Sequence, residues 1–232
     1  MDHGTPHRGG QFFALPGYDC AMDAPPLAPA ATPATPAGPI DDADDQPLHP
    51  DFVAALAAGS SEHYADPDLY DHEYRSRRGD LRWYCRLAAD LAAEQPGPPP
   101  GTPPSATPDP LRILELGCGS GRLTVPLLRA GHAVCGVDHS APMLQRLRAR
   151  LGFLNARTRA RVHILQSDFR TLPLQARFPL ILCPFNSFLH LYTRRDVERF
   201  FAGVRGLLSP GGLFAFDVMH PDPAWLARPP GR

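Results

Sequence analysis

Five short apolar runs, separated by helical patterns, occupy the second half of the chain. The apolar runs lie at residues 111–116, 132–137, 162–166, 179–183 and 213–218. Between them, segments with apolar residues three or four positions apart, the period of an amphipathic helix, lie at 121–130, 141–152 and 193–208. This alternation predicts an α/β fold with a doubly wound, mostly parallel sheet. In such sheets, ligands bind at the carboxyl ends of the strands.

Local signals place several boundaries of these elements. Ser140 is a suitable N-cap for the helix at 141–152, and Thr193 with Asp196 has the spacing of a capping box. Gly79 is expected to interrupt the helical pattern that starts at Asp66. The sequence Ser-Pro-Gly-Gly at 209–212 predicts a turn before the last strand.

The first half of the chain has a different composition. Its first 50 residues mix Pro, Ala, Gly and Asp, and such a segment buries too little apolar surface to offset its ordering entropy. Helical patterns follow, and a run with eight prolines among sixteen residues then predicts a stiff linker. We therefore divide the chain into a disordered tail (1–50), an N-terminal helical cap (51–94), a Pro-rich linker (95–110), a core (111–219) and a Pro-rich tail (220–232).

Composition narrows the classes of function. All 23 basic side chains counted as Lys or Arg are Arg, and the net charge of −1 argues against a general polyanion binder. The arginines between 146 and 161 are therefore interpreted as a solvated face, and nucleic acid is not an expected partner. The five cysteines lack metal-ligand spacing, so no metal is expected. No apolar run reaches about 18 residues and the N-terminus lacks an apolar signal core, so we expect a cytoplasmic protein that does not enter the membrane.

The most informative stretch is ILELGCGSGRL at residues 113–123. An apolar run carrying Glu115 leads into Gly117, Gly119 and Gly121 before a helical pattern begins. Glycines at these positions let a ligand approach the backbone closely. The spacing differs from the dinucleotide fingerprint G-x-G-x-x-G, because Arg122 stands where its third glycine would be.

Three acids fall at or just past the ends of the first three predicted strands. They are Glu115, Asp138 and Asp168. Asp138 lies about 20 residues beyond the glycines, where an acid binds ribose hydroxyls in nucleotide-binding sheets. For any one acid the alternative is a strand-end turn or a helix cap. Three together with the glycine loop favour a nucleotide-like ligand.

The acid followed by G-x-G-x-G resembles motif I of class I S-adenosylmethionine (SAM)-dependent methyltransferases, over residues 66–219. The resemblance implies a Rossmann-like sheet and SAM as the cofactor, with S-adenosylhomocysteine as product. It implies that Glu115 binds the amino group of SAM, Asp138 the ribose, and Asp168 the adenine amino group, with Phe169 or Met143 against the ring. The expected cofactor-binding residues are Arg77, Glu115, Gly117, Cys118, Gly119, Gly121, Asp138, His139, Met143, Ser167, Asp168, Phe169 and Pro184.

Within that superfamily the pattern resembles the glycine/sarcosine N-methyltransferases and related small-molecule methyltransferases. Tyr70 and Arg77 look like their N-terminal helix, which implies that Tyr70 faces the methyl-transfer centre and Arg77 the SAM carboxylate. Asn186 and His190, in Asn-Ser-Phe-Leu-His, look like their segment lining the substrate site. Tyr70, Asn186 and His190 are the candidate catalytic residues. His190 is interpreted as lining or structural rather than as a general base, because methyl transfer to a neutral amine needs little beyond positioning.

Two departures from that family disfavour an amino acid as the acceptor. Pro179 stands where an acid usually begins the fourth strand. Met219 stands where those enzymes have an Arg that binds the substrate carboxylate. We therefore expect methyl transfer to another small molecule, with nitrogen favoured over oxygen or carbon. The alternatives are a catalytically silent SAM-binding fragment and a nicotinamide-dependent oxidoreductase.

The end of the sequence gives a last expectation. Class I methyltransferases carry two more strands after the fifth, but residues 219–232 contain four prolines, each without a ladder donor. We expect a sheet of about five strands that lacks the last two, with the fifth at an exposed edge. We also expect the chain to be a fragment of a longer protein.

Overall fold

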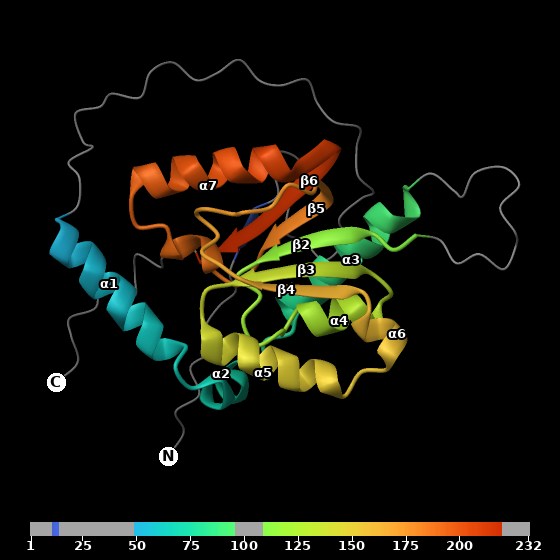
Figure 1. The fold of residues 1–232 in the computed structure, drawn as a ribbon, viewed down its shortest axis with the longest axis horizontal. Helices are drawn as coiled ribbons and strands as arrows, with labels where there is room; N and C mark the ends of the chain where they lie inside the picture. The colour runs from blue at the N-terminus through green and yellow to red at the C-terminus, as the bar shows by residue number, and fades with distance from the viewer. Residues whose placement is uncertain (1–10, 14–48, 96–108, 220–232) are drawn as a thin grey trace, which may run out of the picture.

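A mostly parallel sheet forms the centre of the molecule (Figure 1). The computed structural model describes residues 11–13, 49–95 and 109–219. The sheet order is β1-β6-β5-β2-β3-β4, and every neighbouring pair is parallel except β1 with β6. The strands are β1 (Gln11–Phe13), β2 (Arg112–Leu116), β3 (Ala133–Asp138), β4 (Val162–Gln166), β5 (Phe178–Cys183) and β6 (Leu208–Val218). The predicted doubly wound α/β sheet is confirmed.

Helices cover both faces of the sheet. They are α1 (Pro50–His63), α2 (Pro67–Tyr74), α3 (Gly79–Ala93), α4 (Thr124–Arg129), α5 (Ala141–Gly152), α6 (Ala156–Arg159), the 3₁₀ turn η2 (Ser187–His190) and α7 (Arg194–Leu207). Helix α7 lies on one side of the sheet, and α4 and α5 lie on the other (Figure 1).

The alternation of side chains along β2 divides the core into two layers. Ile113 packs with residues of α3, α4 and α5, whereas Leu114 and Leu116 pack with α7 on the opposite face. Successive side chains of a strand point to opposite faces, so a central strand needs apolar residues at nearly every position. Glu115 therefore occupies an otherwise apolar layer, directed toward α4.

The predicted helix starts agree with the observed caps in most cases. The Thr193 hydroxyl accepts a hydrogen bond from the Asp196 amide at 3.1 Å, as the capping-box spacing predicts. Ser140 is the N-cap of α5, although its side chain makes no cap hydrogen bond. The break at Gly79 is confirmed, because α2 ends at Tyr74 and α3 begins at Gly79.

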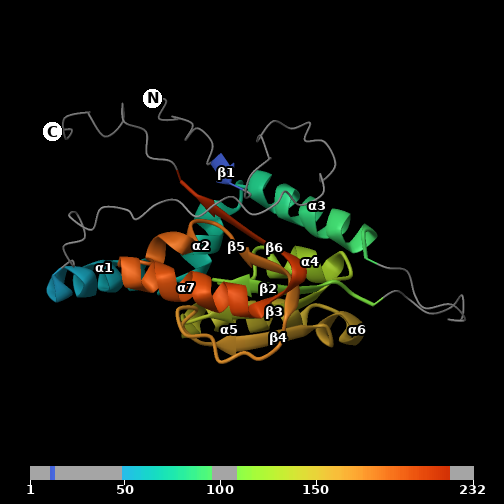
Figure 2. The same ribbon diagram turned by 90° about the horizontal axis from the view of Figure 1, so that it is seen from above.

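Three expectations about the sheet and its neighbours were wrong. The fifth parallel strand, β6, is not at an exposed edge, because β1 pairs with it antiparallel through Gln11↔Val218 to Phe13↔Phe216 (Figure 2). This strand also lies inside the segment for which we predicted disorder. Strand β6 begins at Leu208 rather than at residue 213, so residues 209–212 form an irregularity in the pairing with β5 instead of a separating turn. Helix α4 begins at Thr124 rather than residue 121, because the glycine loop extends that far.

Several predictions concern residues outside the described ones. The structure does not describe residues 1–10, 14–48, 96–108 and 220–232. The predictions made for them, a disordered N-terminal tail, a Pro-rich linker and a Pro-rich C-terminal tail, therefore fall outside the described residues.

Candidate functional site

A cleft of about 280 Å³ opens at the carboxyl ends of β2, β3 and β5. Its walls come from the loops after these strands, from the loop after β4, and from α1 and α2. The sequence-predicted residues that line it are Tyr70, Glu115, Gly117, Cys118, Gly119, Asp138, His139, Met143, Asp168, Phe169, Pro184 and His190. The position at the carboxyl edge is the one that the strand–helix alternation predicts for a ligand.

Two glycines of the loop after β2 are required by close contacts. A Cβ at Gly117, where φ is +75°, would lie 2.4 Å from the Ser187 hydroxyl oxygen. A Cβ at Gly119, where φ is +50°, would lie 3.2 Å from the terminal methyl of Met143. Any other residue would therefore strain the backbone at both positions, and at Gly117 its Cβ would also clash with Ser187.

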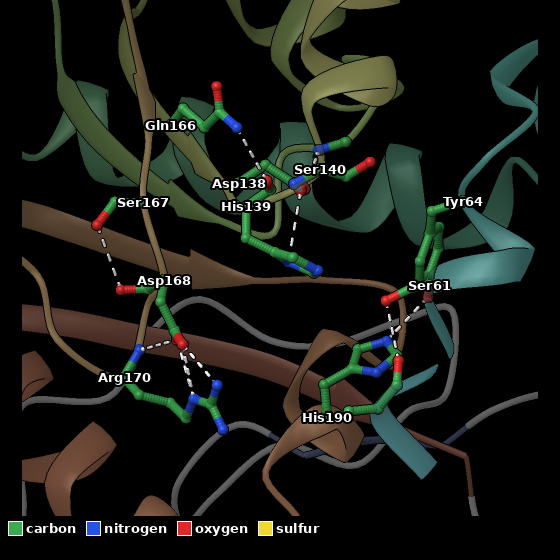
Figure 3. A network of polar contacts seen from close by, with 12 residues as sticks. Ser61, Tyr64, Asp138, His139, Ser140, Gln166, Ser167, Asp168, Arg170 and His190 are labelled. Atoms are coloured by element: carbon green, nitrogen blue, oxygen red, sulfur yellow. Dashed lines mark hydrogen bonds and ion pairs between the residues drawn. The ribbon is translucent and has the colours of Figure 1, made fainter. Parts of the chain in front are cut away.

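Asp138 is held in one orientation by the backbone around it. Its Oδ2 accepts a hydrogen bond from the Gly119 amide at 2.8 Å, and its Oδ1 accepts one from the Ser140 amide at 2.8 Å (Figure 3 shows the Ser140 contact). The residue is 9% exposed and lines the cleft. Each carboxylate oxygen has a second lone pair, so Asp138 can accept two further hydrogen bonds from a ligand.

Glu115 is a buried carboxyl group beneath the glycine loop. It is 1% exposed, and the Thr124 hydroxyl donates a hydrogen bond to it at 2.7 Å. Burial raises the pKa of Glu115 to about 8, although the Thr124 hydrogen bond and the Arg122 charge oppose this shift. The group can therefore change its charge near neutral pH when a cation is placed beside it.

Asp168 lies in a tight ion pair with Arg170. The Arg170 Nε and Nη2 donate to Asp168 Oδ2 at 2.9 and 2.6 Å, and the Arg170 amide donates to Oδ1 at 2.9 Å (Figure 3). Partial burial acts to raise the pKa of Asp168, but the hydrogen bonds from Arg170 outweigh it and the net pKa is lowered. Asp168 is therefore ionised at neutral pH and available as an acceptor at the rim of the cleft.

A chain of hydrogen bonds forms the opposite wall. The Tyr64 hydroxyl contacts His190 Nε2 at 2.8 Å, and the other ring nitrogen of His190 contacts the Tyr192 hydroxyl at 3.2 Å (Figure 3 shows the Tyr64 contact). The Tyr192 hydroxyl contacts the Ser60 hydroxyl at 2.6 Å. Burial lowers the pKa of His190 and raises that of Tyr64 to about 12, so both side chains are neutral near pH 7.

Tyr70 lies between this wall and the loop after β5. Its ring centroid is 5.8 Å from that of Tyr64, 4.7 Å from Tyr74 and 6.3 Å from Phe185. Burial raises the pKa of Tyr70. The phenol is a neutral group that lines the cleft within an aromatic cluster.

The loop after β5 is held in an unusual conformation by Asp217. Phe185 and Asn186 have φ of +57° and +62°, in the left-handed region. Asp217 Oδ1 accepts hydrogen bonds from the Phe185 amide and the Tyr84 hydroxyl, both at 2.6 Å, and Oδ2 accepts one from the Asn186 amide at 3.3 Å. A carboxylate on β6 thus sets the shape of one wall of the cleft.

The structure does not bring four of the predicted residues to the cleft. Arg77, in the turn between α2 and α3, is exposed and lines a separate cavity. Gly121 packs against Leu147, whose Cδ1 would be 2.3 Å from a Cβ there. Ser167 directs its hydroxyl to the Asp168 carbonyl. Asn186 accepts a hydrogen bond from the Met219 amide and so supports the end of β6.

Other residues of the cleft were missed by the sequence reasoning. They are Ala57, Ser60, Ser61, Tyr64, Ser120, Arg122, Leu123, Arg170, Phe185, Ser187 and Tyr192. Ser120, Arg122 and Leu123 belong to the glycine-loop motif, and Tyr192 is two residues from His190, so proximity to a motif was a usable signal. Nothing in the local pattern of α1 marks its serines or Tyr64 as lining residues.

Part of the chain is similar in sequence to known methyltransferases. Residues 113–212 match a protein family described as "Methyltransferase domain". The chain is 34% identical over 114 residues to a glycine/sarcosine N-methyltransferase of Halorhodospira halochloris. This match covers 48% of this chain and 41% of that protein. It is 30% identical over 123 residues to the cypemycin N-terminal methyltransferase of a Streptomyces species. This match covers 53% of this chain and 47% of that protein. The chain thus spans less than half the length of these two relatives.

Solved structures were also compared. The glycopeptide N-methyltransferase MtfA complexed with SAM is similar with a TM-score of 0.45 and 30% identity, over 57% of this chain and 53% of that one. The CcbJ methyltransferase from Streptomyces caelestis gives a TM-score of 0.48 and 29% identity, over 59% of this chain and 51% of that one. Separately, among the described residues no helix is both long and apolar enough to cross a membrane.

Proposed function

We propose that the cleft binds SAM and that the chain transfers its methyl group to a small-molecule acceptor. The match of residues 113–212 to a family described as "Methyltransferase domain" supports this proposal. Nitrogen is the favoured acceptor atom. The product of the cofactor is then S-adenosylhomocysteine.

The observation that carries this proposal is the position of Asp138. Its carboxylate lies at the end of β3, is oriented by the amides of Gly119 and Ser140, and retains free lone pairs toward the cleft. Adjacent hydroxyl donors on a ribose match two adjacent carboxylate oxygens. The glycine loop beside it leaves room for a ligand to contact the backbone.

The remaining parts of SAM have suitable partners on the walls of the cleft. Asp168 at the rim is an acceptor for the adenine amino group, and Met143 and Phe169 supply apolar surface for the ring. Glu115 lies below the glycine loop, where a charge-assisted hydrogen bond to the amino group of SAM would favour its ionised form.

For the SAM carboxylate, the structure supports Arg122 better than Arg77. Arg122 lines the cleft, its guanidinium lies 4.0 Å from the Phe185 ring centroid, and it is paired with Asp80. Arg77 lines the neighbouring cavity instead. We therefore assign carboxylate binding to Arg122.

The acceptor would occupy the side of the cleft formed by Tyr70, Tyr64 and His190. These groups are neutral near pH 7 and can both donate and accept hydrogen bonds, which suits an uncharged amine. Methyl transfer is an in-line displacement at the sulfonium, so the main contributions of the protein are orientation and exclusion of water. His190 and Tyr70 act here as positioning groups for the acceptor.

The experiment is titration calorimetry with SAM, S-adenosylhomocysteine and NAD, followed by a methyl-release assay. We expect SAM and S-adenosylhomocysteine to bind and NAD not to. Saturable binding of SAM without methyl release to any amine tested would favour the silent SAM-binding alternative, and binding of NAD alone would contradict the proposal.

The matched variant is Asp138→Ala. Loss of two hydrogen bonds to a charged acceptor should weaken SAM binding by about 1.5–3 kcal/mol, or roughly 10- to 150-fold. Asp90→Ala is the control, because Asp90 is an exposed acid on α3, away from the cleft. Unchanged SAM affinity in a folded Asp138→Ala protein would remove this residue from the site.

A further inference from the structure

A second, larger cavity lies next to the cleft. It occupies about 880 Å³ between the turn that joins α2 to α3, helix α4 and the end of α5. Arg122 and its neighbour Gly121 stand at the boundary, since Arg122 lines both cavities and Gly121 lines only the second. The proposed function uses none of the other groups in this cavity.

Arginines from four separate segments converge on this cavity. Three of them already have partners: Arg122 is paired with Asp80, Arg150 lies 3.5 Å from Asp71, and Arg75 donates to the His72 carbonyl. Asp71, the acid that lines this cavity, and the nearby Asp80 are thus both paired with arginines.

Four further arginines on the wall of this cavity have no acidic partner among the described residues. They are Arg77, Arg78, Arg82 and Arg129, and all four are exposed. The guanidinium of Arg77 lies 5.5 Å from the Tyr74 ring centroid, a cation–π contact that orients it without neutralising it. On a chain whose net charge is −1, this is a strong local excess of positive charge.

The rest of the lining is apolar. Leu81, Val125 and Pro126 contribute to the wall, and Phe153 stands beside them with 88% of its surface exposed. A wall of guanidinium groups beside an apolar surface suits a ligand with an anionic end and an apolar body.

We propose that this cavity binds the phosphate group of a small phosphorylated molecule that also has an apolar part. Guanidinium groups present paired donors that match phosphate oxygens, and they keep their charge at all relevant pH values. The size of the cavity is that of a site for a cofactor-sized ligand rather than for an extended polymer. This inference goes beyond the proposed function and does not depend on it.

The test uses pyrophosphate and 1-naphthyl phosphate as probes, titrated into the full chain by calorimetry. We expect one saturable site for each probe, tighter binding of naphthyl phosphate because of its apolar ring, and weaker binding at higher salt. A short single-stranded RNA is the comparison ligand, and it should bind no better than pyrophosphate.

The double variant Arg78→Gln/Arg82→Gln should weaken both probes by roughly tenfold or more, because two charged donors are lost. The control is Arg148→Gln/Arg205→Gln, which removes the same charge from exposed positions outside the cavity. If the double variant failed to fold, as judged by its melting curve, Arg129→Gln would serve in its place. Absence of saturable binding, or equal losses in the double variant and the control, would overturn the proposal.

Discussion

The buried carboxyl group of Glu115 should make the free energy of unfolding depend on pH. Its side chain is 1% exposed, and burial raises its pKa to about 8 from an ordinary value of 4.5. In Glu115→Gln the shape is retained, and the amide oxygen can still accept the hydrogen bond from the Thr124 hydroxyl. The substitution therefore removes the ionisation and little else.

The direction in which the free energy of unfolding changes with pH follows from proton linkage. Between pH 4.5 and 8 the unfolded chain has lost the Glu115 proton and the folded chain still holds it, so folding takes up a proton. The stabilisation is complete below pH 4.5 and is lost as the pH rises through 8. At 1.36 kcal/mol per pKa unit, wild type should lose about 4 kcal/mol by pH 8 relative to the Gln variant.

The measurement is the free energy of unfolding of both proteins by denaturant titration at several values between pH 5 and 8.5. Other titrating groups cancel in the difference between wild type and variant, so the difference isolates Glu115. Glu62→Gln is the control, because Glu62 is exposed on α1. If the wild-type and Glu115→Gln curves remained parallel across this range, or if wild type gained stability relative to the variant, the assignment of a buried, protonated carboxyl would be wrong.

Two further predictions concern the walls of the cleft. Tyr84→Phe removes a hydroxyl that donates at 2.6 Å to the buried Asp217, and it should lower the free energy of unfolding by about 1–3 kcal/mol in a denaturant titration; an unchanged value would show that this hydrogen bond does not stabilise the fold. Gly117→Ala forces a Cβ into a left-handed conformation and against Ser187, so it should cost at least about 1 kcal/mol and also weaken SAM binding; normal stability and SAM affinity would contradict the need for glycine there.

The order of strands and helices could be read from the sequence because it depends on local signals. Residues 141–152 and 162–166 have the bounds that their apolar patterns predict. The grouping of the acids at strand ends could also be predicted. Glu115, Asp138 and Asp168 reach one cleft because the carboxyl ends of parallel strands share one edge of the sheet.

Contacts between segments distant in sequence could not be read in this way. Strand β1 covers the edge of β6 from about 200 positions away in the chain, and no periodicity of either segment specifies that pairing. Arg77 was expected in the cleft and lines the neighbouring cavity instead, and no local pattern in the turn between α2 and α3 distinguishes the two.

The sequence by itself determined the α/β class, the glycine loop and the row of acids, because backbone sterics and burial period act on neighbouring residues. Only the tertiary structure decided which groups complete the cleft. Ser60 on α1 and Tyr64 at its C-terminal cap join Tyr192 and His190 across more than 120 residues, and Asp217 on β6 shapes a loop 31 residues before it. Those contacts depend on how whole elements dock, and docking is governed by the summed burial of many side chains rather than by any local pattern.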